Sequence, residues 1–268
     1  MITVLKRLLG AALLLAMVAC ATSPTGRSQL MLVTEESAIN ASKTAYTQML
    51  KPFEEEGKLD NDPALKARVD RITGRLIAQA VIMRPETRDW EWSIRIIDDP
   101  ETINAWAMAG GKMALYTGLI EKVEPTDDEL AQVLGHEISH ALAKHTAEKM
   151  SVAMATQLGV LAVAASTEKQ GALVGAALAA KLAVELPNSR TAEVEADRIG
   201  IELAAKAGYD PRAAATLWRK MANVGGNRMP QFLSTHPSPV NREETLNRLA
   251  KDMMPYYRAK GERPTFKF

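Results

Sequence analysis

The sequence predicts a mostly α-helical domain with one small β-sheet, an α+β fold. Aromatic residues make up only 5% of the 268 residues and alanine is abundant, which favours close packing between helices. Several long segments repeat apolar residues at the three- and four-residue spacing of a helix. Only two short stretches, residues 92–97 and 103–117, alternate as strands do. A chain of this length holds one sizeable hydrophobic core or two small ones.

The first twenty residues are predicted to be a targeting segment. An uncharged stretch, residues 8–19, follows two basic residues and is too short for a comfortable membrane span. It ends at Cys20, the single cysteine, in a Met-Val-Ala-Cys sequence that resembles the cleavage box of bacterial lipoproteins. This resemblance implies a signal peptide at residues 1–19, lipidation of Cys20 and a lipid-anchored tether at residues 20–33. An ordinary signal peptide or an uncleaved anchor is the alternative.

Residues 34–268 are expected to form a single domain. The residue after Cys20 is Ala21 rather than the aspartate that marks inner-membrane retention, so the resemblance implies a periplasm-facing lipoprotein of the bacterial cell envelope, at the outer membrane. The formal net charge is +1, which provides no basic field to attract nucleic acid. We therefore expect no nucleic-acid partner, and the sequence does not indicate an oligomeric state.

Two helices and a small sheet are expected next. Residues 34–56 begin with a plausible helix start at Thr34, and residues 63–83 carry apolar side chains at helical spacing. Residues 103–117 are predicted to be a hairpin that turns at Gly110-Gly111. Its first strand has a face of small residues that suits either an extended substrate or packing against a helix. The residues predicted to bind substrate there are Asn104, Ala105 and Ala107.

The strongest chemical motif lies on the next predicted helix. Thr126 and Glu129 have the spacing of a capping box, and the helix is expected to continue to about Met150. It contains His136-Glu137-Ile138-Ser139-His140. Histidines at positions i and i+4 lie on one helical face, so both imidazoles can bind one zinc ion. Glu137 is then placed to accept a proton from an activated water molecule.

Glu193 is the predicted third ligand, which leaves one position of the zinc ion open. Glu193 and Asp197 are also separated by four residues on a predicted helix that begins at residue 188 or 189 and ends near Gly208. Asp197 is expected to accept the free ring N–H of a ligand histidine. Glu195 points elsewhere on the helical wheel and is interpreted as a surface charge.

The other segments are less informative. Residues 151–187 are predicted to be a helical hairpin, buried or membrane-facing, with burial favoured. Another helix is expected to open at Pro211, and a last one to cover residues 242–254. Between them lies a Gly/Pro-rich loop, residues 225–240, in which Gly225-Gly226 is interpreted as a hinge.

At these motifs the chain resembles the HtpX-like gluzincin peptidases, which include the CAAX prenyl endopeptidases. The shared features are the HEISH motif, the Glu193-to-Asp197 spacing within SRTAEVEAD, and STHPSPVNR at residues 234–242. The lipoprotein start followed by SPTGRSQLMLV is most similar to the LoiP-type members. Taken as a whole, the chain most resembles the LoiP and BepA type of periplasmic lipoprotein metalloproteases. The resemblance implies a zincin-type metallopeptidase domain.

The resemblance also implies roles for two later residues. His236 is expected near the active site, either as a hydrogen-bond donor to the developing oxyanion or as a fourth zinc ligand in a resting state. The alternative is a histidine in a surface loop without a role in the site. Arg242 is expected to support this loop or to orient substrate. His145 lies off the face of His136 and is interpreted as structural.

The predicted function is a zinc-dependent endopeptidase with one zinc ion per chain. By resemblance, its substrates are misfolded or membrane-associated envelope proteins, and its role is quality control. The alternative is a lipoprotein chaperone or assembly factor with a latent or structural zinc site. Glu137 discriminates between the two, because a purely structural site does not need it. Prenyl-protein processing is disfavoured, because a membrane chamber would need several spans.

Overall fold

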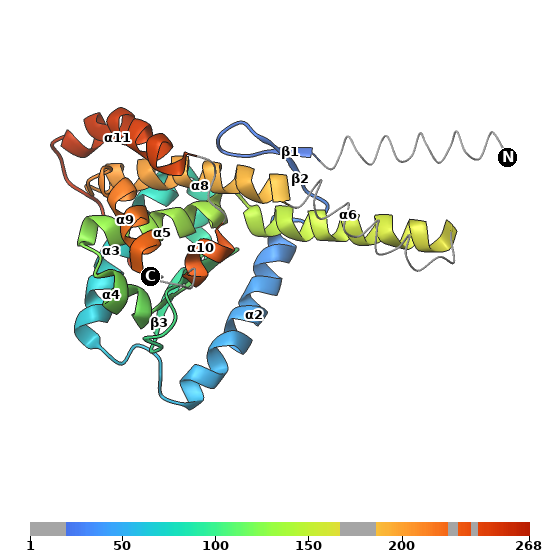
Figure 1. Cartoon of the computed structure of the whole chain (residues 1–268), viewed down its shortest axis with the longest axis horizontal. Coiled ribbons are helices and arrows are strands. Elements are labelled where there is room, and N and C mark those ends of the chain that lie inside the picture. Colours follow the sequence, from blue (N-terminus) through green and yellow to red (C-terminus); the bar gives the residue numbers. More distant parts are fainter. Residues whose placement is uncertain (1–19, 167–185, 225–229, 237–240) are drawn as a thin grey trace.

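The computed structural model describes residues 20–166, 186–224, 230–236 and 241–268 (Figure 1). It confirms a mostly helical protein with small sheets. The elements, in chain order, are β1 (Cys20–Thr22), β2 (Ser28–Leu30), α2 (Glu35–Glu55), α3 (Pro63–Met83), the 3-10 helix η1 (Pro85–Asp89), β3 (Ser93–Ile97), β4 (Ala105–Met108), β5 (Lys112–Tyr116), α4 (Thr117–Val123), α5 (Asp127–Leu142), α6 (His145–Ser166), α8 (Leu186–Lys206), α9 (Ala213–Val224), α10 (Gln231–Thr235) and α11 (Arg242–Arg258).

The three-stranded sheet has the order β3-β5-β4, so β4 lies at one edge. β5 pairs parallel to β3 and antiparallel to β4. The predicted hairpin turn is confirmed: Gly110 and Gly111 both have positive φ angles, 77° and 75°. A Cβ atom at Gly111 would lie 2.3 Å from the ring of Trp92, so only glycine fits this turn.

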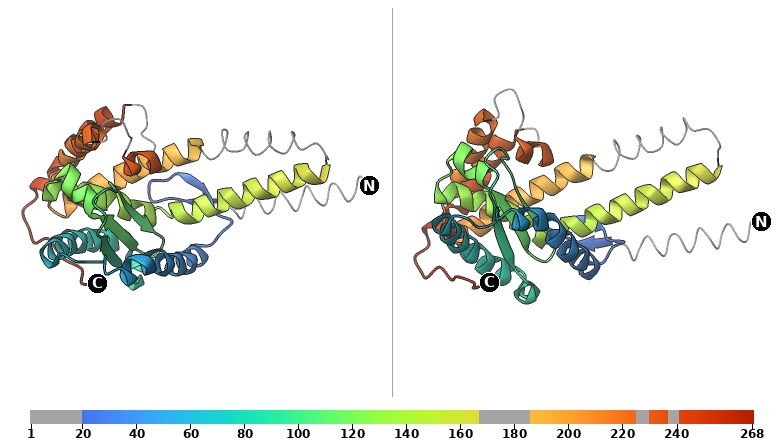
Figure 2. Two further views of the ribbon diagram at one scale, coloured as in Figure 1. Left: turned by 60° about the horizontal axis from the view of Figure 1, so that its bottom comes forward. Right: turned by 90° about the horizontal axis from the view of Figure 1, so that it is seen from below.

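The main hydrophobic core lies between this sheet and helices α3 and α5 (Figure 2). Its fully buried large side chains include Ile72, Leu76, Ile94, Leu115, Leu134 and Ile138. Each such side chain contributes roughly 1.5–3 kcal/mol through removal from water. The first half of α5 is therefore packed against both the sheet and α3. This packing also fixes the position of the functional residues in its second half.

Helix α5 crosses α8 at two glycines. A Cβ atom at Gly135 would lie 2.9 Å from the carbonyl oxygen of Gly200, and one at Gly200 would lie 2.8 Å from the backbone nitrogen of His136. The two backbones therefore approach more closely than any larger residue would allow. This crossing brings the HExxH motif of α5 beside the acidic residues of α8.

The predicted continuous helix to Met150 is wrong. α5 ends at Leu142, and α6 begins at His145 after Lys144 has adopted a left-handed φ of 58°. Tertiary hydrogen bonds satisfy the carbonyl groups at this break: the guanidinium of Arg84 donates to Leu142 O, and Gln29 Nε2 donates to Ala143 O at 2.7 Å. These partners lie far away in sequence, so local periodicity gives no signal for the break.

Residues 20–30 do not form the expected tether. β1 and β2 form an antiparallel pair, and the turn between them contains Arg27. Arg27 makes two ion pairs with buried carboxylates, Glu148 at 2.6 Å and Glu195 at 2.8 Å. These ion pairs hold the hairpin against the body of the protein. The predicted signal peptide, residues 1–19, lies outside the described residues.

Helix α6 extends away from the rest of the described chain (Figures 1 and 2). Burial was the favoured prediction for this segment, but Met154, Leu158 and Leu161 are exposed, since no described element covers that part of α6. No helix in the described residues is long and apolar enough to cross a membrane. The second half of the predicted hairpin, residues 167–185, lies outside the described residues, as does the predicted hinge at residues 225–226.

Candidate metal centre

The histidines of the HExxH motif lie one helical turn apart on α5 and point to the same place. Their Nε2 atoms are 3.1 Å apart, and the rings meet edge to face with centroids 4.7 Å apart. His136 is buried and His140 is largely so. The helical spacing of four residues therefore produces the pair of donors predicted from it.

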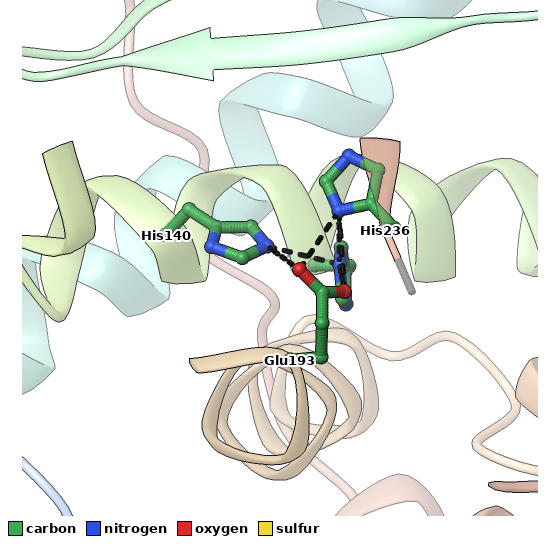
Figure 3. Close-up of side chains that lie close together, drawn as sticks. His140, Glu193 and His236 are labelled. Carbon is green, nitrogen blue, oxygen red and sulfur yellow. Dashed lines mark hydrogen bonds and ion pairs between the residues drawn. The ribbon is translucent and has the colours of Figure 1, made fainter. Parts of the chain in front are cut away.

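Glu193, on α8, completes a three-residue set. Its Oε2 atom lies 3.2 Å from His136 Nε2, and its Oε1 atom lies 3.5 Å from His140 Nε2. Its side chain is buried, so the carboxylate needs partners of opposite charge in place of water. Figure 3 shows His140, Glu193 and His236 converging on one point between the two helices.

His236, the residue that directly follows α10, is a fourth member of this set. Its Nδ1 atom lies 3.3 Å from His136 Nε2 and 3.2 Å from both Glu193 oxygens. Phe232 stacks on its ring, with centroids 4.4 Å apart, and Phe232 N donates a hydrogen bond to Ile103 O at 3.1 Å. The short helix α10 is thereby fixed beside β4, which holds His236 over the other donors.

These donors fit a zinc ion. One atom from each of His136, His140, Glu193 and His236 can be chosen so that all four lie within 4.8 Å of one another. Two nitrogens bound tetrahedrally at 2.0–2.1 Å to one zinc ion lie about 3.3 Å apart, close to the spacing of the HExxH histidines. Imidazoles and a carboxylate are also the donor types that zinc accepts.

The electrostatics of the metal-free site are dominated by burial and by paired charges. Burial lowers the pKa of His136, but its hydrogen bonds to Asp197 and Glu193 outweigh burial and raise this pKa to about 9. Burial and the neighbouring His136 lower the pKa of His140. Burial raises the pKa of Glu193, but His136 and His236 hold it well below its usual range. Glu193 is therefore an anion, ready to bind a cation.

Glu137 lies beside the donors rather than among them. Its Oε2 atom accepts a hydrogen bond of 3.0 Å from the backbone N–H of Ala107. Its buried Oε1 atom accepts no hydrogen bond from any described residue, although His236 Nε2 lies 3.3 Å away. Burial raises the pKa of Glu137, which makes it a better proton acceptor. The residue thus has one oxygen anchored by a backbone N–H and a second oxygen that faces the ring of His236.

Asp197 and Arg242 support the ring of His136 on the side away from the other donors. His136 Nδ1 lies 3.0 Å from Asp197 Oδ1, and Arg242 donates to the same oxygen at 2.6 Å. The guanidinium of Arg242 also lies 3.4 Å from the ring centroid of Trp218. Arg242 is buried and is not among the residues that line the cleft, so this position suits support of Asp197 rather than direct contact with substrate.

A cleft of about 800 Å³ opens onto the donors. Of the three residues predicted to bind substrate, Asn104 and Ala107 line it. Ala105 does not, because it is fully buried opposite Leu115 of β5. Two polar side-chain atoms of cleft residues, Asn104 Oδ1 and Trp106 Nε1, are buried and have no hydrogen-bond partner among the described residues.

Two residues near the site were misjudged from sequence. Glu195 is not a surface charge: its side chain is only 3% exposed and is paired with Arg27 and His145. His145, interpreted as structural and off the face of His136, lies next to a metal-site histidine: the break after α5 turns its ring toward His140, with the two Nδ1 atoms 2.8 Å apart. The position of Glu195 between Glu193 and Asp197 is the sequence feature that could have indicated a place near the site. The helical wheel, used alone, assigns this residue to the solvent-facing side.

Comparison of the sequence with known proteins assigns the chain to a family. The model of peptidase family M48 matches residues 63–250, which include both helices of the metal centre. The chain belongs to peptidase family M48. The M48 membership confirms the prediction of a zinc metallopeptidase. It does not single out the LoiP, BepA or HtpX type.

Curated relatives of this M48 chain are themselves proteases. It is 37% identical over 238 residues to a bovine protein named metalloendopeptidase OMA1, mitochondrial, covering 84% of this chain and 45% of the relative. It is 36% identical over 238 residues to the human protein of that name, covering 84% and 44%. It is 30% identical over 211 residues to the beta-barrel assembly-enhancing protease of Yersinia pestis, covering 75% and 42%. The chain spans about half the length of these relatives.

The predicted localisation, a lipoprotein of the bacterial outer membrane, is contradicted. The bovine, human, Arabidopsis and two yeast relatives of this M48 chain are all named as mitochondrial or as mitochondrial metalloendopeptidases. A short apolar stretch after basic residues occurs in several classes of targeting segment, so this local pattern was a weak basis for a location. The lipid anchor on Cys20 was inferred from the same pattern and loses its support with it.

Proposed function

We propose that this chain is an endopeptidase that holds one zinc ion through His136, His140 and Glu193 and uses Glu137 as its general base. The observation that carries this proposal is the state of Glu137. Its Oε2 atom is fixed by Ala107, while its buried Oε1 atom accepts no hydrogen bond from the described residues and lies beside the donor set. A buried carboxylate oxygen without a partner is costly, so its retention at this place supports a role in proton transfer.

The residues of this chain would share the reaction as follows. Zinc, when bound, supplies Lewis-acid polarisation of the scissile carbonyl and lowers the pKa of a water molecule. Glu137 takes the proton of the attacking water on Oε1 and delivers it to the leaving amine nitrogen. Ala107 N–H keeps the carboxylate oriented during both transfers. The outer edge of β4, which pairs with no further strand among the described residues, offers backbone groups to an extended peptide, which would then lie across the donors.

His236 is proposed to hold the resting site closed. Its Nδ1 atom lies within hydrogen-bonding distance of His136 Nε2 and of both Glu193 oxygens, as expected of a fourth ligand. A tetrahedral zinc site with four protein ligands leaves no position for water. Substrate entry would displace His236, whose ring would then be free to donate a hydrogen bond to the scissile carbonyl oxygen as it gains charge.

The proposed substrates are misfolded or membrane-associated proteins. Relatives named metalloendopeptidase and beta-barrel assembly-enhancing protease support a polypeptide substrate. The role proposed for this cleavage is protein quality control. The second candidate function is a chaperone or assembly factor with a latent zinc site. The four-donor arrangement favours that candidate, whereas the position of Glu137 beside the donors, with an Oε1 atom that accepts no hydrogen bond from the described residues, argues against it.

Cleavage of casein by the purified chain tests this proposal. The zinc-loaded protein should cleave casein, a chelator should stop cleavage, and added zinc should restore it. Glu137→Gln should keep one zinc per chain and lose cleavage, because an amide does not accept the proton of water. Cleavage by Glu137→Gln at a rate near that of the unaltered chain would contradict the proposed base. Zinc binding without any cleavage by the unaltered chain would favour the chaperone.

A further inference from the structure

The two HExxH histidines are supported in different ways at their second ring nitrogens. His136 Nδ1 faces Asp197 Oδ1 directly, at 3.0 Å. His140 Nδ1 instead faces another histidine, His145 Nδ1, at 2.8 Å. Ligand histidines usually donate this second N–H to an oxygen, which fixes the orientation and tautomer of the ring. The contact with His145 therefore raises the question of what fixes His140.

His145 passes the contact on to a carboxylate. Its Nε2 atom lies 3.1 Å from Glu195 Oε2, and both side chains are buried. Glu195 also accepts a hydrogen bond from Thr25 Oγ1 and one from Arg27 Nε at 2.8 Å. Thr25 and Arg27 lie in the turn of the N-terminal hairpin, between β1 and β2. The chain of contacts thus runs from the hairpin through Glu195 and His145 to His140.

One arrangement of hydrogens satisfies all of these contacts once His140 binds a metal ion through Nε2. His140 Nδ1 must then carry a hydrogen and donate it, so His145 Nδ1 must accept. The hydrogen of a neutral His145 is therefore on Nε2, where it is donated to Glu195 Oε2. Glu195 thereby selects the only tautomer of His145 that can accept from His140.

Ion pairs of Arg27 connect the hairpin to this arrangement. Arg27 places its Nη1 and Nη2 atoms on the two oxygens of Glu148, both at 2.6 Å, while its Nε atom stays on Glu195. Gln29 Nε2 donates to Glu148 Oε2 at 2.8 Å. Arg27 therefore pairs with both buried carboxylates and keeps Glu195 in place. Arg242 has the matching place on the other side, where it donates to Asp197.

We propose that His145, Glu195 and Arg27 are positioning residues for the metal ligand His140, so that the N-terminal hairpin is a working part of the metal site. Each HExxH histidine is then linked to a carboxylate of α8, His136 directly and His140 through His145. Each of these carboxylates is paired with an arginine from another part of the chain. This inference rests on the proposed zinc site. It extends the site to residues 20–30, which lie outside the segment matched by the family model, residues 63–250.

Zinc affinity, measured with a competing chelator, tests the proposal. His145→Leu removes both contacts and should weaken zinc binding about 10–100-fold, as loss of such outer partners does elsewhere. His145→Gln is the conservative variant, since its amide can accept from His140 and donate to Glu195. It should restore most of the lost affinity. Arg27→Met should also weaken zinc binding, because Glu195 loses the cation that holds it.

Arg219→Met is the matched control for the loss of an arginine. Arg219 pairs with Glu243 through exposed side chains and contacts no residue of the chain of contacts, so zinc affinity should not change. The visible absorption of the cobalt-substituted protein gives an independent readout. It should change in His145→Leu and Arg27→Met, where the ring of His140 is no longer held, and stay as in the unaltered chain in Arg219→Met.

Unchanged zinc affinity and an unchanged cobalt spectrum in a folded His145→Leu protein would overturn the proposal. Should that variant not fold, the same two results in Arg27→Met would overturn it. Failure of the proposed function looks different: the unaltered chain would bind zinc without cleaving casein, while His145→Leu would still weaken zinc binding.

Discussion

Gly200 of α8 packs directly against the backbone of His136 on α5. A Cβ atom at position 200 would lie 2.8 Å from His136 N and 2.9 Å from His136 Cα. Both are backbone atoms of a buried helix, so neither can move away as a flexible side chain would. The distance between the two helices, and with it the distance from Glu193 to the HExxH histidines, depends on this glycine.

Gly200→Ala should therefore destabilise the protein and weaken its zinc site. Overpacking of this kind costs about 1–3 kcal/mol of unfolding free energy. Gly159→Ala is the matched control, because Gly159 is exposed on α6 and a Cβ atom there meets nothing within 4 Å. It should be neutral or stabilising by up to about 1 kcal/mol. Urea unfolding of both variants measures the difference, and equal stability would contradict the tight crossing.

Zinc affinity should depend steeply on pH, because zinc needs the neutral form of His136. In the metal-free protein the pKa of His136 is raised to about 9, so below that pH a proton competes with zinc. Apparent affinity should fall about tenfold for each pH unit below 9. Chelator competition between pH 6.5 and 8.5 measures this, and an affinity that stays constant would show that His136 is not protonated there.

The raised pKa also predicts how the metal-free protein responds to pH. A histidine whose pKa is higher in the folded state stabilises the fold below the unfolded value of about 6.5. That contribution is lost as the pH rises from there to about 9, the folded value. Unfolding free energy of the metal-free chain should therefore decrease over this range. An increase over the same range would contradict the assignment.

His236→Ala should increase the rate of casein cleavage while leaving zinc bound, if His236 closes the resting site as a fourth ligand. Three protein ligands remain, and the fourth position becomes free for water. Ser234→Ala is the control for disturbance of this segment, because the Ser234 hydroxyl is exposed and, among the described residues, donates to Gln231 O within α10. A lower rate in His236→Ala, with zinc retained, would show that the hydrogen bond of His236 to the developing oxyanion outweighs its closing of the resting site.

The sequence predicted the parts of the site that depend on helical spacing. His136 with His140, and Glu193 with Asp197, are separated by four residues, and that spacing survives in any α-helix. The capping box of Thr126 and Glu129 is likewise local, and both of its hydrogen bonds are present. Neither inference needed knowledge of how the helices pack.

Features that depend on distant partners were not predictable in the same way. The break at Lys144 is supported by Arg84 and Gln29, which come from other elements. Glu195 is buried because Arg27 neutralises it from 168 positions away in sequence. A helical wheel has no information about either partner, so it places Glu195 in solvent and His145 off the face of His136.

Location of the metal by anomalous scattering at the zinc absorption edge tests the central claim most directly. In crystals of the zinc-loaded chain we expect one strong peak per chain, at about 2.0–2.2 Å from His136 Nε2, His140 Nε2 and a Glu193 oxygen. The same experiment on Glu193→Ala should show the peak lost or greatly weakened. A peak elsewhere, or one of full strength in Glu193→Ala, would contradict the proposed metal centre.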